Sequence, residues 1–597
     1  MIFHRPAMAR YSTLLSIALL LAPLACRVKP KAPPQEKYQN LPSKDVPAVF
    51  NDSIFQRADL QNNEGYPVTG YGLVVNLRGT GSGPYPTAIK DFMVKAMVKA
   101  GIGSALQPGY ENLSPEQMLN DKRIAIVQVD AFIPPGARDR QTFDVYVSAI
   151  AQSYTTSLAG GEMYRTDLQE RQSTPGVNVL ARSQGTIFVN PTHVMESASG
   201  DISKLGPTAR ASLRSGVIMD GGVSTFDRPL ILRLITPQRS MARAIEARIN
   251  DVFQDGKTAS AIDEALVYFY VPERFNGDWE HFSGIVTHLY FNGSVDFTVT
   301  KSKQLAAEAI KPDAPLMDIS YAWEGLGKNA LPHIVPLMTH ASPDVAYAAA
   351  RAAAFLEDSS ALTALMGMAQ NNSHPFQIEA VQTLGKLKSS PLVNGMLRRL
   401  LDSDLNTVRI EAYSILAKNG DGSIYSKVIK SNSNGTLKEK YVLDIVPSKA
   451  APVVYASRTG TPRLAIIGDG AKLKVPIVWT TMNETLMVAS NESGTGLTLF
   501  YRGTGARPIK VLSHMDLAEV VARLGGEGPL TEQRLDFNYT DVVGIVQNLT
   551  DDKQVSALRG TTRVDASFVL QELSDDQTDI LDTPIDERIT RPQADAK

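Results

Sequence analysis

Short apolar runs separated by turn residues dominate the chain from about residue 48 to residue 300. The runs Arg123–Val129, Phe143–Ile150 and Ala265–Val271 are rich in β-branched and aromatic side chains, as strands are. Thr87–Ala100 and Ser240–Phe253 instead place apolar residues every three or four positions, which predicts helices packed against a sheet. This part of the chain is therefore predicted to be a β-rich α+β body with flanking helices.

Alanine-rich helical sequence follows, from about Leu305 to Lys418. Within it, Ala348–Ala354, Glu379–Gly385 and Glu411–Ala417 recur at intervals of 31 and 32 residues. A fixed period of this size is typical of stacked helical pairs. The segment resembles the short, alanine-rich class of HEAT repeat, with an ordinary helical bundle as the alternative. Residues 303–420 are expected to form an all-α solenoid that projects from the body as an accessory arm and binds a protein ligand on its concave face.

Beyond Gly420 the pattern returns to short apolar runs between glycine-rich turns. Strands are expected at 452–456, 464–467, 475–480 and 497–501, and helices at 515–524 and 540–549. Asp516 and Asp541 fall near the positive ends of those two helices. Residues 440–573 are therefore predicted to be a second β-rich part, and the acidic, polar residues 574–597 a disordered tail.

The N-terminus has the pattern of an export signal. His4, Arg5 and Arg10 precede the uncharged run Tyr11–Ala25, which is shorter than the ~20 residues that a transmembrane helix needs. Cys26 follows directly and is the only cysteine in the chain. Residues 1–26 resemble the signal of bacterial lipoproteins, in which that cysteine is lipidated, although Pro23 stands where those signals carry leucine; an incidental cysteine is the alternative.

Residues 27–47 carry Lys, Pro and Gln without apolar periodicity, which predicts a flexible tether. The net charge does not indicate a partner, because 60 basic and 62 acidic residues give a formal net charge of −2. Such a balance provides no field to gather nucleic acid, so a nucleic-acid partner is not expected. With one cysteine, the chain cannot form an internal disulfide, so its stability must come from packing.

Several glycine-rich and proline-rich segments follow one another in a fixed order along the body. The first reads GYGLVVNLRGTG over residues 70–81, and the last reads RTGT over residues 458–461. In order and spacing these segments resemble those of flagellar basal-body P-ring proteins. The residues that carry the resemblance are Gly70, Tyr71, Gly72, Leu73, Val74, Val75, Gly79, Thr80, Gly81, Pro134, Pro135, Ala137, Arg138, Gly160, Gly161, Gln184, Gly185, Arg458, Thr459, Gly460 and Thr461.

The resemblance implies how the chain is divided. P-ring proteins pass within a few residues from a strand, here Ile285–Phe291, into the segment that here is Val453–Thr461, so the helical repeats look inserted. Insertion is tolerated where the host ends lie close together, because the cost of loop closure grows slowly with length. The expected parts are a P-ring-like body at 48–302, HEAT-like repeats at 303–420, and residues 440–573 completing the body. The two β-rich segments would then fold together as one subunit.

A P-ring resemblance implies structural work rather than catalysis. Such a subunit assembles with copies of itself into a periplasmic ring around the flagellar rod, at the peptidoglycan and below the outer-membrane ring. A lipid on Cys26 would place this chain at the outer membrane. No enzyme activity, cofactor or metal is expected. The lipid cysteine and the repeats depart from the family pattern, so an envelope lipoprotein scaffold with a P-ring-like fold and no flagellar role is the alternative.

Four motifs could carry other chemistry. Gly79–Gly83 lacks the Gly-Lys-Ser/Thr of a phosphate loop and is expected to be a turn. Ser183 lies in a near match to a nucleophile elbow, which makes an envelope hydrolase a second alternative, but the next residues continue as a strand. His281 and His288 have no third ligand nearby and are expected to be satisfied or surface histidines. Asp402, Asp404 and Asn406 mimic a calcium loop without its glycine, which favours a cap between repeat helices.

Overall fold

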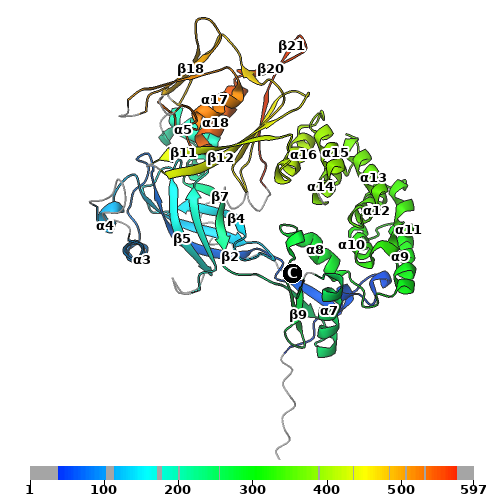
Figure 1. Ribbon diagram of the computed structural model, residues 1–597. Coiled ribbons are helices and arrows are strands. Elements are labelled where there is room, and N and C mark those ends of the chain that lie inside the picture. The colour runs from blue at the N-terminus through cyan, green and yellow to red at the C-terminus, as the bar shows by residue number, and fades with distance from the viewer. Residues whose placement is uncertain are drawn as a thin grey trace, which may run out of the picture.

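The computed structural model describes residues 38–101, 113–170, 178–199, 202–254, 256–387, 390–433, 436–482, 484–503, 507–529 and 533–573. Over these residues it is a mixed α+β protein with one closed barrel, four open sheets and a curved run of helices (Figure 1). Cys26, residues 27–37 of the expected tether and residues 574–597 of the expected tail lie outside the described residues. Within the described residues, no helix is both long and apolar enough to cross a bilayer.

A closed six-stranded barrel forms the N-terminal part of the body. Its strands follow the order β2-β3-β4-β7-β6-β5, and β2 pairs with β5 to close it. Its interior is filled by alternate strand residues such as Val68, Val129 and Val147. The bounds are β2 Tyr66–Val75, β3 Ala125–Ile133, β4 Thr142–Ala149, β5 Glu162–Glu170, β6 Ala181–Thr186 and β7 Ser215–Ser224. The strands predicted at Arg123–Val129 and Phe143–Ile150 are confirmed as β3 and β4. The helix predicted at Thr87–Ala100 is confirmed as α3, Thr87–Lys99.

A smaller sheet lies beside the barrel, in the order β1-β8-β10-β9. The helix predicted at 240–253 is confirmed as α7, Arg239–Val252, which buries Ala242, Ile245 and Ile249 against this sheet. The strands are β1 Ala58–Gln61, β8 Leu230–Leu234, β9 Ala259–Ala261 and β10 Leu266–Phe269; short helices of the body are α2 Ile54–Arg57, α4 Pro115–Met118, α5 Pro191–Ser199 and α6 Pro207–Leu213.

The last residues of the expected tether contact this smaller sheet. The Tyr38 hydroxyl donates to Asp263 at 2.5 Å, and the Leu41 N–H donates to the Ile235 carbonyl oxygen at 2.9 Å. The folded body therefore begins about ten residues before the boundary that the sequence suggested.

The strand expected at Ile285–Phe291 is wrong. This stretch begins inside helix α8, Trp279–Thr287, and only Tyr290 makes a β-bridge, to Ser53. Phe282, Ile285 and Leu289 recur at helical spacing and are buried together against the small sheet. That shared burial outweighs the local β-propensity of Ile285 and its β-branched neighbours.

The helical repeats confirm the period in the sequence. The three recurring segments lie in α12 Pro343–Phe355, α14 Gln377–Lys386 and α16 Asn406–Lys418, which pack in series. Ala349, Ala350 and Ala353 are fully buried, and their small side chains allow neighbouring helices to approach closely. The other helices are α9 Val295–Ala309, α10 Leu316–Leu326, α11 Leu331–Ile334, α13 Ser359–Gln370 and α15 Pro391–Leu400.

The repeats do not project as a free arm, so that expectation is wrong. Figure 1 shows an arc that starts beside α8 and ends against the sheet β11-β12-β14-β13-β22. At the far end Val408, Tyr413 and Leu416 of α16 share a core with Val446 and Val453 of that sheet. The sheet's strands are β11 Tyr425–Ser433, β12 Thr436–Val446, β13 Val453–Ala456, β14 Arg463–Ile467 and β22 Ser567–Leu570.

The remaining C-terminal elements pack onto the same core as the barrel. One apolar cluster contains barrel residues such as Val145 together with Val454 of β13 and Val543 of α18. The strands predicted at 452–456, 464–467 and 497–501 are confirmed, whereas the strand expected from 475 starts at Val478, after Pro476, which has no N–H to donate to a ladder. The bounds are β15 Lys472–Leu473, β16 Val478–Thr481, β17 Leu486–Ser490, β18 Leu497–Tyr501, β19 Ile509–Ser513, α17 Leu517–Leu524, α18 Tyr539–Asp551, β20 Val555–Arg559 and β21 Thr562–Asp565.

Arg409 of α16 provides a test of the arc's C-terminal attachment. It is 2% exposed, and its guanidinium donates to the carbonyl oxygens of Leu401 at 3.0 Å, Ala451 at 2.8 Å and Ile467 at 3.1 Å. Arg409→Ala removes all three of these buried hydrogen bonds, and only the Leu401 oxygen keeps a second side-chain donor, Ser448, so we expect a loss of about 3 kcal/mol in the free energy of unfolding. Urea unfolding measures it, with the exposed Arg399→Ala as the control. Equal midpoints for the two variants would contradict the attachment.

Candidate functional site

The residues that carry the P-ring resemblance lie in strands and turns of the body. Gly70–Val75 lie in β2, Gln184 and Gly185 in β6, and Arg458–Thr461 in the turn between β13 and β14. The turn after β3 holds Pro134, Pro135, Ala137 and Arg138, and the turn before β5 holds Gly160 and Gly161. Gly160, Gln184, Gly185 and Thr461 line one cleft of about 380 Å³ between the barrel and the C-terminal part. The structure therefore brings these four together and leaves the proline turn elsewhere.

Two of the motif glycines are required by close contacts or backbone angles. A Cβ on Gly81 would lie 2.3 Å from the carbonyl oxygen of Ile124, so a side chain would push the turn off the barrel. Gly460 has a φ of +66°, in the left-handed region that glycine adopts at little cost. Gly79 to Gly83 thus form a turn against the barrel, as the sequence predicts, and not a phosphate loop.

The C-terminal RTGT turn docks onto the barrel through Asp144 of β4. The Gly460 N–H donates to both carboxylate oxygens of Asp144 at 3.0 Å, and the Asp220 N–H donates to one of them at 2.7 Å. Thr461 adds a hydrogen bond from its hydroxyl to the Asp220 carboxylate at 2.9 Å. Burial raises the pKa of Asp144 although these amide hydrogens stabilise its charged form. The carboxylate therefore accepts amide hydrogens from both the barrel and the C-terminal turn.

A second contact links the first motif to helix α18. Arg78, within the GYGLVVNLRGTG segment, pairs with Asp541, whose side chain is fully buried in the first turn of α18. The negative charge of the Asp541 carboxylate is the main reason why the pKa of Arg78 is raised. Thr540 beside it accepts a hydrogen bond from the Val189 N–H at 3.3 Å. We call Arg78, Asp144, Asp220, Gly460, Thr461 and Asp541 the junction.

The polar side chains of the junction are engaged in contacts between the barrel and the C-terminal part. The carboxylates of Asp144 and Asp220, which are half-buried, and of Asp541, which is buried, accept hydrogen bonds from amides, a hydroxyl or a guanidinium. Among the described residues that line the cleft, none is histidine or cysteine. Lys438 and Glu162 pair across the cleft, and Lys440 pairs with Asp536 at its edge.

The remaining candidate motifs also have structural explanations. Ser183 lies within β6, is 1% exposed, and its Oγ has no hydrogen-bond partner among the described residues, so no base is in place to activate it. The cap expected around Asp402 is wrong: Leu405 occupies the N-cap of α16 without a side-chain hydrogen bond, and Asp402 instead accepts the Lys449 N–H at 2.6 Å. No group of three or more metal-ligating side chains occurs among the described residues.

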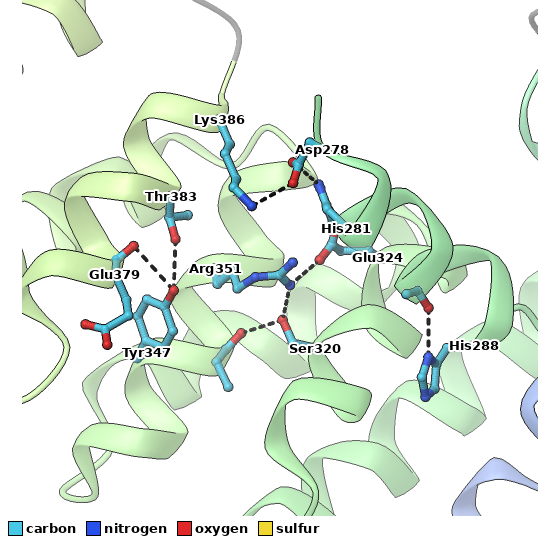
Figure 2. Close-up of polar contacts among 12 residues, drawn as sticks. Asp278, His281, His288, Ser320, Glu324, Tyr347, Arg351, Glu379, Thr383 and Lys386 are labelled. Carbon is cyan, nitrogen blue, oxygen red and sulfur yellow. Dashed lines mark hydrogen bonds and ion pairs between the residues drawn. The ribbon is translucent and has the colours of Figure 1, made fainter. Parts of the chain in front are cut away.

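A polar cluster with a buried centre joins the other end of the arc to the body. We call it the clasp, and its residues are Asp278, His281, Ser320, Glu324, Arg351 and Lys386, of which Lys386 is exposed. Figure 2 shows side chains of α8, α10 and α12 converging on Glu324. His281 Nε2 lies 2.5 Å from one Glu324 oxygen, and Arg351 Nη1 donates to the other at 2.5 Å. Asp278 accepts from Lys386 of α14 at 2.7 Å. Three repeat helices are thereby joined to the body.

The expectation of satisfied histidines holds fully for His281. His288 bonds the Gly284 carbonyl oxygen through Nδ1 at 2.7 Å and stacks on Phe55, while its Nε2 lies 3.4 Å from Asp318. The clasp as a whole was not predicted from the sequence. Arg351 in the middle of the run AAARAAA was the available signal, because a charged residue on a buried helix face needs a partner.

Comparison with known proteins bears on the body and the repeats separately. Residues 54–298 match the flagellar P-ring protein family. Residues 331–420 match HEAT repeats. Both resemblances read from the sequence are therefore confirmed, and the matched P-ring segment contains the whole barrel and the small sheet.

Individual relatives support the P-ring match. The flagellar P-ring protein of Legionella pneumophila is 28% identical over 231 residues, which is 38% of this chain and 58% of the relative. That of Sinorhizobium fredii is 29% identical over 236 residues, with 38% and 58% covered, and that of Aquifex aeolicus is 27% identical over 234 residues, with 39% and 59% covered. The chain thus spans under two thirds of the length of these relatives, and the junction's C-terminal half lies outside the matched segment.

Arg78→Met tests the junction. It leaves the Asp541 carboxylate buried without its cation, and because Arg78 itself is half-exposed we expect a loss of about 2 kcal/mol in the free energy of unfolding. Adding Asp541→Leu removes the orphaned charge and is expected to recover most of that loss. Chemical denaturation measures both, with the exposed Arg563→Met as the control. If the double variant is no more stable than Arg78→Met, the pair does not hold the junction.

The clasp predicts a pH dependence. Burial opposes the charge on His281, but hydrogen bonds to Asp278 and Glu324 outweigh it and raise its pKa above the ordinary 6.5. Its stabilisation is therefore complete below pH 6.5 and is lost as the pH rises through the raised pKa. We expect His281→Asn to cost about 1 kcal/mol more at about pH 6 than at about pH 8.5. Thermal unfolding across that range measures it, with His333→Asn as the control; a pH-independent difference would contradict the charged form.

Proposed function

We propose that this chain is the structural subunit of a periplasmic ring resembling the flagellar P ring. One observation supports this most: the segment that matches the P-ring family folds into a closed barrel whose motif residue Arg78 is bonded across the junction to the C-terminal part. A subunit of a bushing must hold its shape under lateral force. A body closed on itself and linked by buried polar contacts meets that need without a catalytic centre.

The parts of the chain take different roles in this proposal. Residues 48–302 and 440–573 form the ring subunit, and the motif residues shape its turns and strand ends. Residues 303–420 form an arc that carries the protein ligand. The flagellar rod, the outer-membrane ring subunits and peptidoglycan are the proposed partners of the body, and a lipid on Cys26 would hold the subunit at the outer membrane.

A scaffold lipoprotein with the same fold and no flagellum is the second candidate. The arc favours it, because residues 331–420 match HEAT repeats and lie outside the segment that matches the P-ring family. Deleting the gene separates the two candidates. Loss of swimming with intact envelope growth supports the ring, whereas normal swimming supports the scaffold.

Electron microscopy of the detergent-extracted native protein tests the ring itself. We expect closed annuli of uniform diameter, because a subunit that contacts its neighbours through two different surfaces closes into a ring when the rotation between copies allows it. Particles purified from cells provide the sample, and protein dissociated in denaturant provides the control. A population of single subunits in the native extract would contradict the proposal.

Lipidation of Cys26 has its own test. We expect Cys26→Ser to abolish incorporation of labelled palmitate and to release the protein from the membrane fraction, because the acyl chains supply the proposed membrane affinity. Adding Ser16→Cys to the same background controls for the mere presence of a thiol in the signal region. Unchanged labelling of Cys26→Ser would contradict the lipoprotein assignment.

A further inference from the structure

The sheet β16-β17-β18-β19 presents one face to solvent. Its strands are antiparallel neighbours, and alternate residues such as Trp479, Leu499 and Val511 point into the shared core. The register places the other residues on the outward face. They are Val478, Thr480, Met487, Ala489, Thr498, Phe500, Lys510 and Leu512.

This outward face is apolar where water should favour polar residues. Antiparallel sheets with one solvated face normally alternate apolar and polar positions. Here Val478 is 79% exposed and Leu512 is 60% exposed, with Phe500 half-buried beside them. Lys510 is the one charged residue among these positions, and its ammonium has no carboxylate partner among the described residues. An apolar face of this kind marks an interaction surface.

A second exposed surface lies on the outside of the barrel. Helix α3 covers part of the outer face of β2 and β3 through Met93 and Met97, and its Phe92 packs edge-to-face against Tyr71 with the ring centroids 6.3 Å apart. Tyr71 is still 37% exposed, and Phe132, farther along β3, is 43% exposed. Between them lies Asp130, which accepts hydrogen bonds from neighbouring polar side chains on the same two strands but has no cation among the described residues.

The two surfaces are complementary in chemistry. One presents mostly apolar side chains, with Phe500 directly across from a lysine that has no carboxylate partner among the described residues, and the other presents aromatic side chains on either side of a carboxylate without a cation among them. Figure 1 shows β18 and β2 at separate ends of the body, so one copy cannot bring its own two surfaces together. Two different surfaces that fit each other make a head-to-tail contact, which builds rings or filaments.

We propose that the outward face of β16–β19 docks on the β2–β3 surface of a second copy of this chain, with Lys510 opposite Asp130 of the neighbouring copy. This rests on the proposed function and identifies the contact between ring subunits. The apolar residues supply most of the affinity, and the charged pair sets the orientation and excludes wrong partners.

Charge reversal tests the pairing. Lys510→Asp and Asp130→Lys each place like charges in the contact, and we expect each to weaken self-association by about tenfold or more. The double variant restores opposite charges and is expected to return to within about threefold of the natural protein. Sedimentation of the native, detergent-extracted protein measures the assembled fraction as a function of concentration.

Two further variants test the apolar face and provide a control outside both surfaces. Leu512→Glu inserts a charge into the apolar face and is expected to abolish assembly, while Lys303→Asp on helix α9 reverses an exposed charge away from both surfaces and is expected to leave assembly unchanged. Circular dichroism melting checks that each variant is folded. A variant that unfolds is replaced by Lys510→Gln or Asp130→Asn, for which a smaller loss of assembly is expected.

The outcomes separate this inference from the proposed function. If the natural protein is monomeric at every concentration, the ring and the contact are both rejected. If it assembles but Lys510→Asp and Leu512→Glu assemble equally well, the ring stands and the β16–β19 face is rejected. If the single variants fail and the charge-swapped double variant fails as well, the β2–β3 surface is rejected as its mate.

Discussion

The body depends on carboxylates whose partners lie far away in the sequence. Half-buried Asp144 is held by the Gly460 amide, 316 residues later, and fully buried Asp541 by Arg78, 463 residues earlier. A buried carboxylate without a partner costs several kcal/mol, so the start of α18 is stable only with Arg78 beside Asp541. The barrel and the C-terminal part must therefore fold against each other, and the apolar core that they share follows from that contact.

The helical arc takes its geometry from the same constraint. Because the junction fixes the two ends of the host chain, the repeats between them must start and finish at the body. The clasp around Glu324 secures the start, and Arg409 secures the end. A solenoid attached at both ends keeps a fixed curvature, so its exposed surface is presented in one orientation relative to the body.

Much of the fold follows from local pattern, and the rest depends on tertiary contacts. Helix α7 was predictable because its apolar spacing matches one helix face, and α12 because its alanine-rich segment recurs at a fixed period. Closure of the barrel by β2 and β5 and the pairing of Asp144 with Gly460 were not predictable, because the choice of these partners is not encoded in local sequence pattern. Ile285 was misassigned since β-branched residues are ambiguous in short runs, and Arg351 was a readable signal whose partner, Glu324, only the fold supplies.

Native-state hydrogen exchange tests most directly whether the two segments form one unit. As denaturant is added, amides of β4 and β7 and amides of β13 and β14 are predicted to converge on one opening free energy, because the junction makes them unfold together. Exchange of β13 and β14 through a separate opening at lower denaturant, with β4 and β7 still protected, would contradict a single folded body.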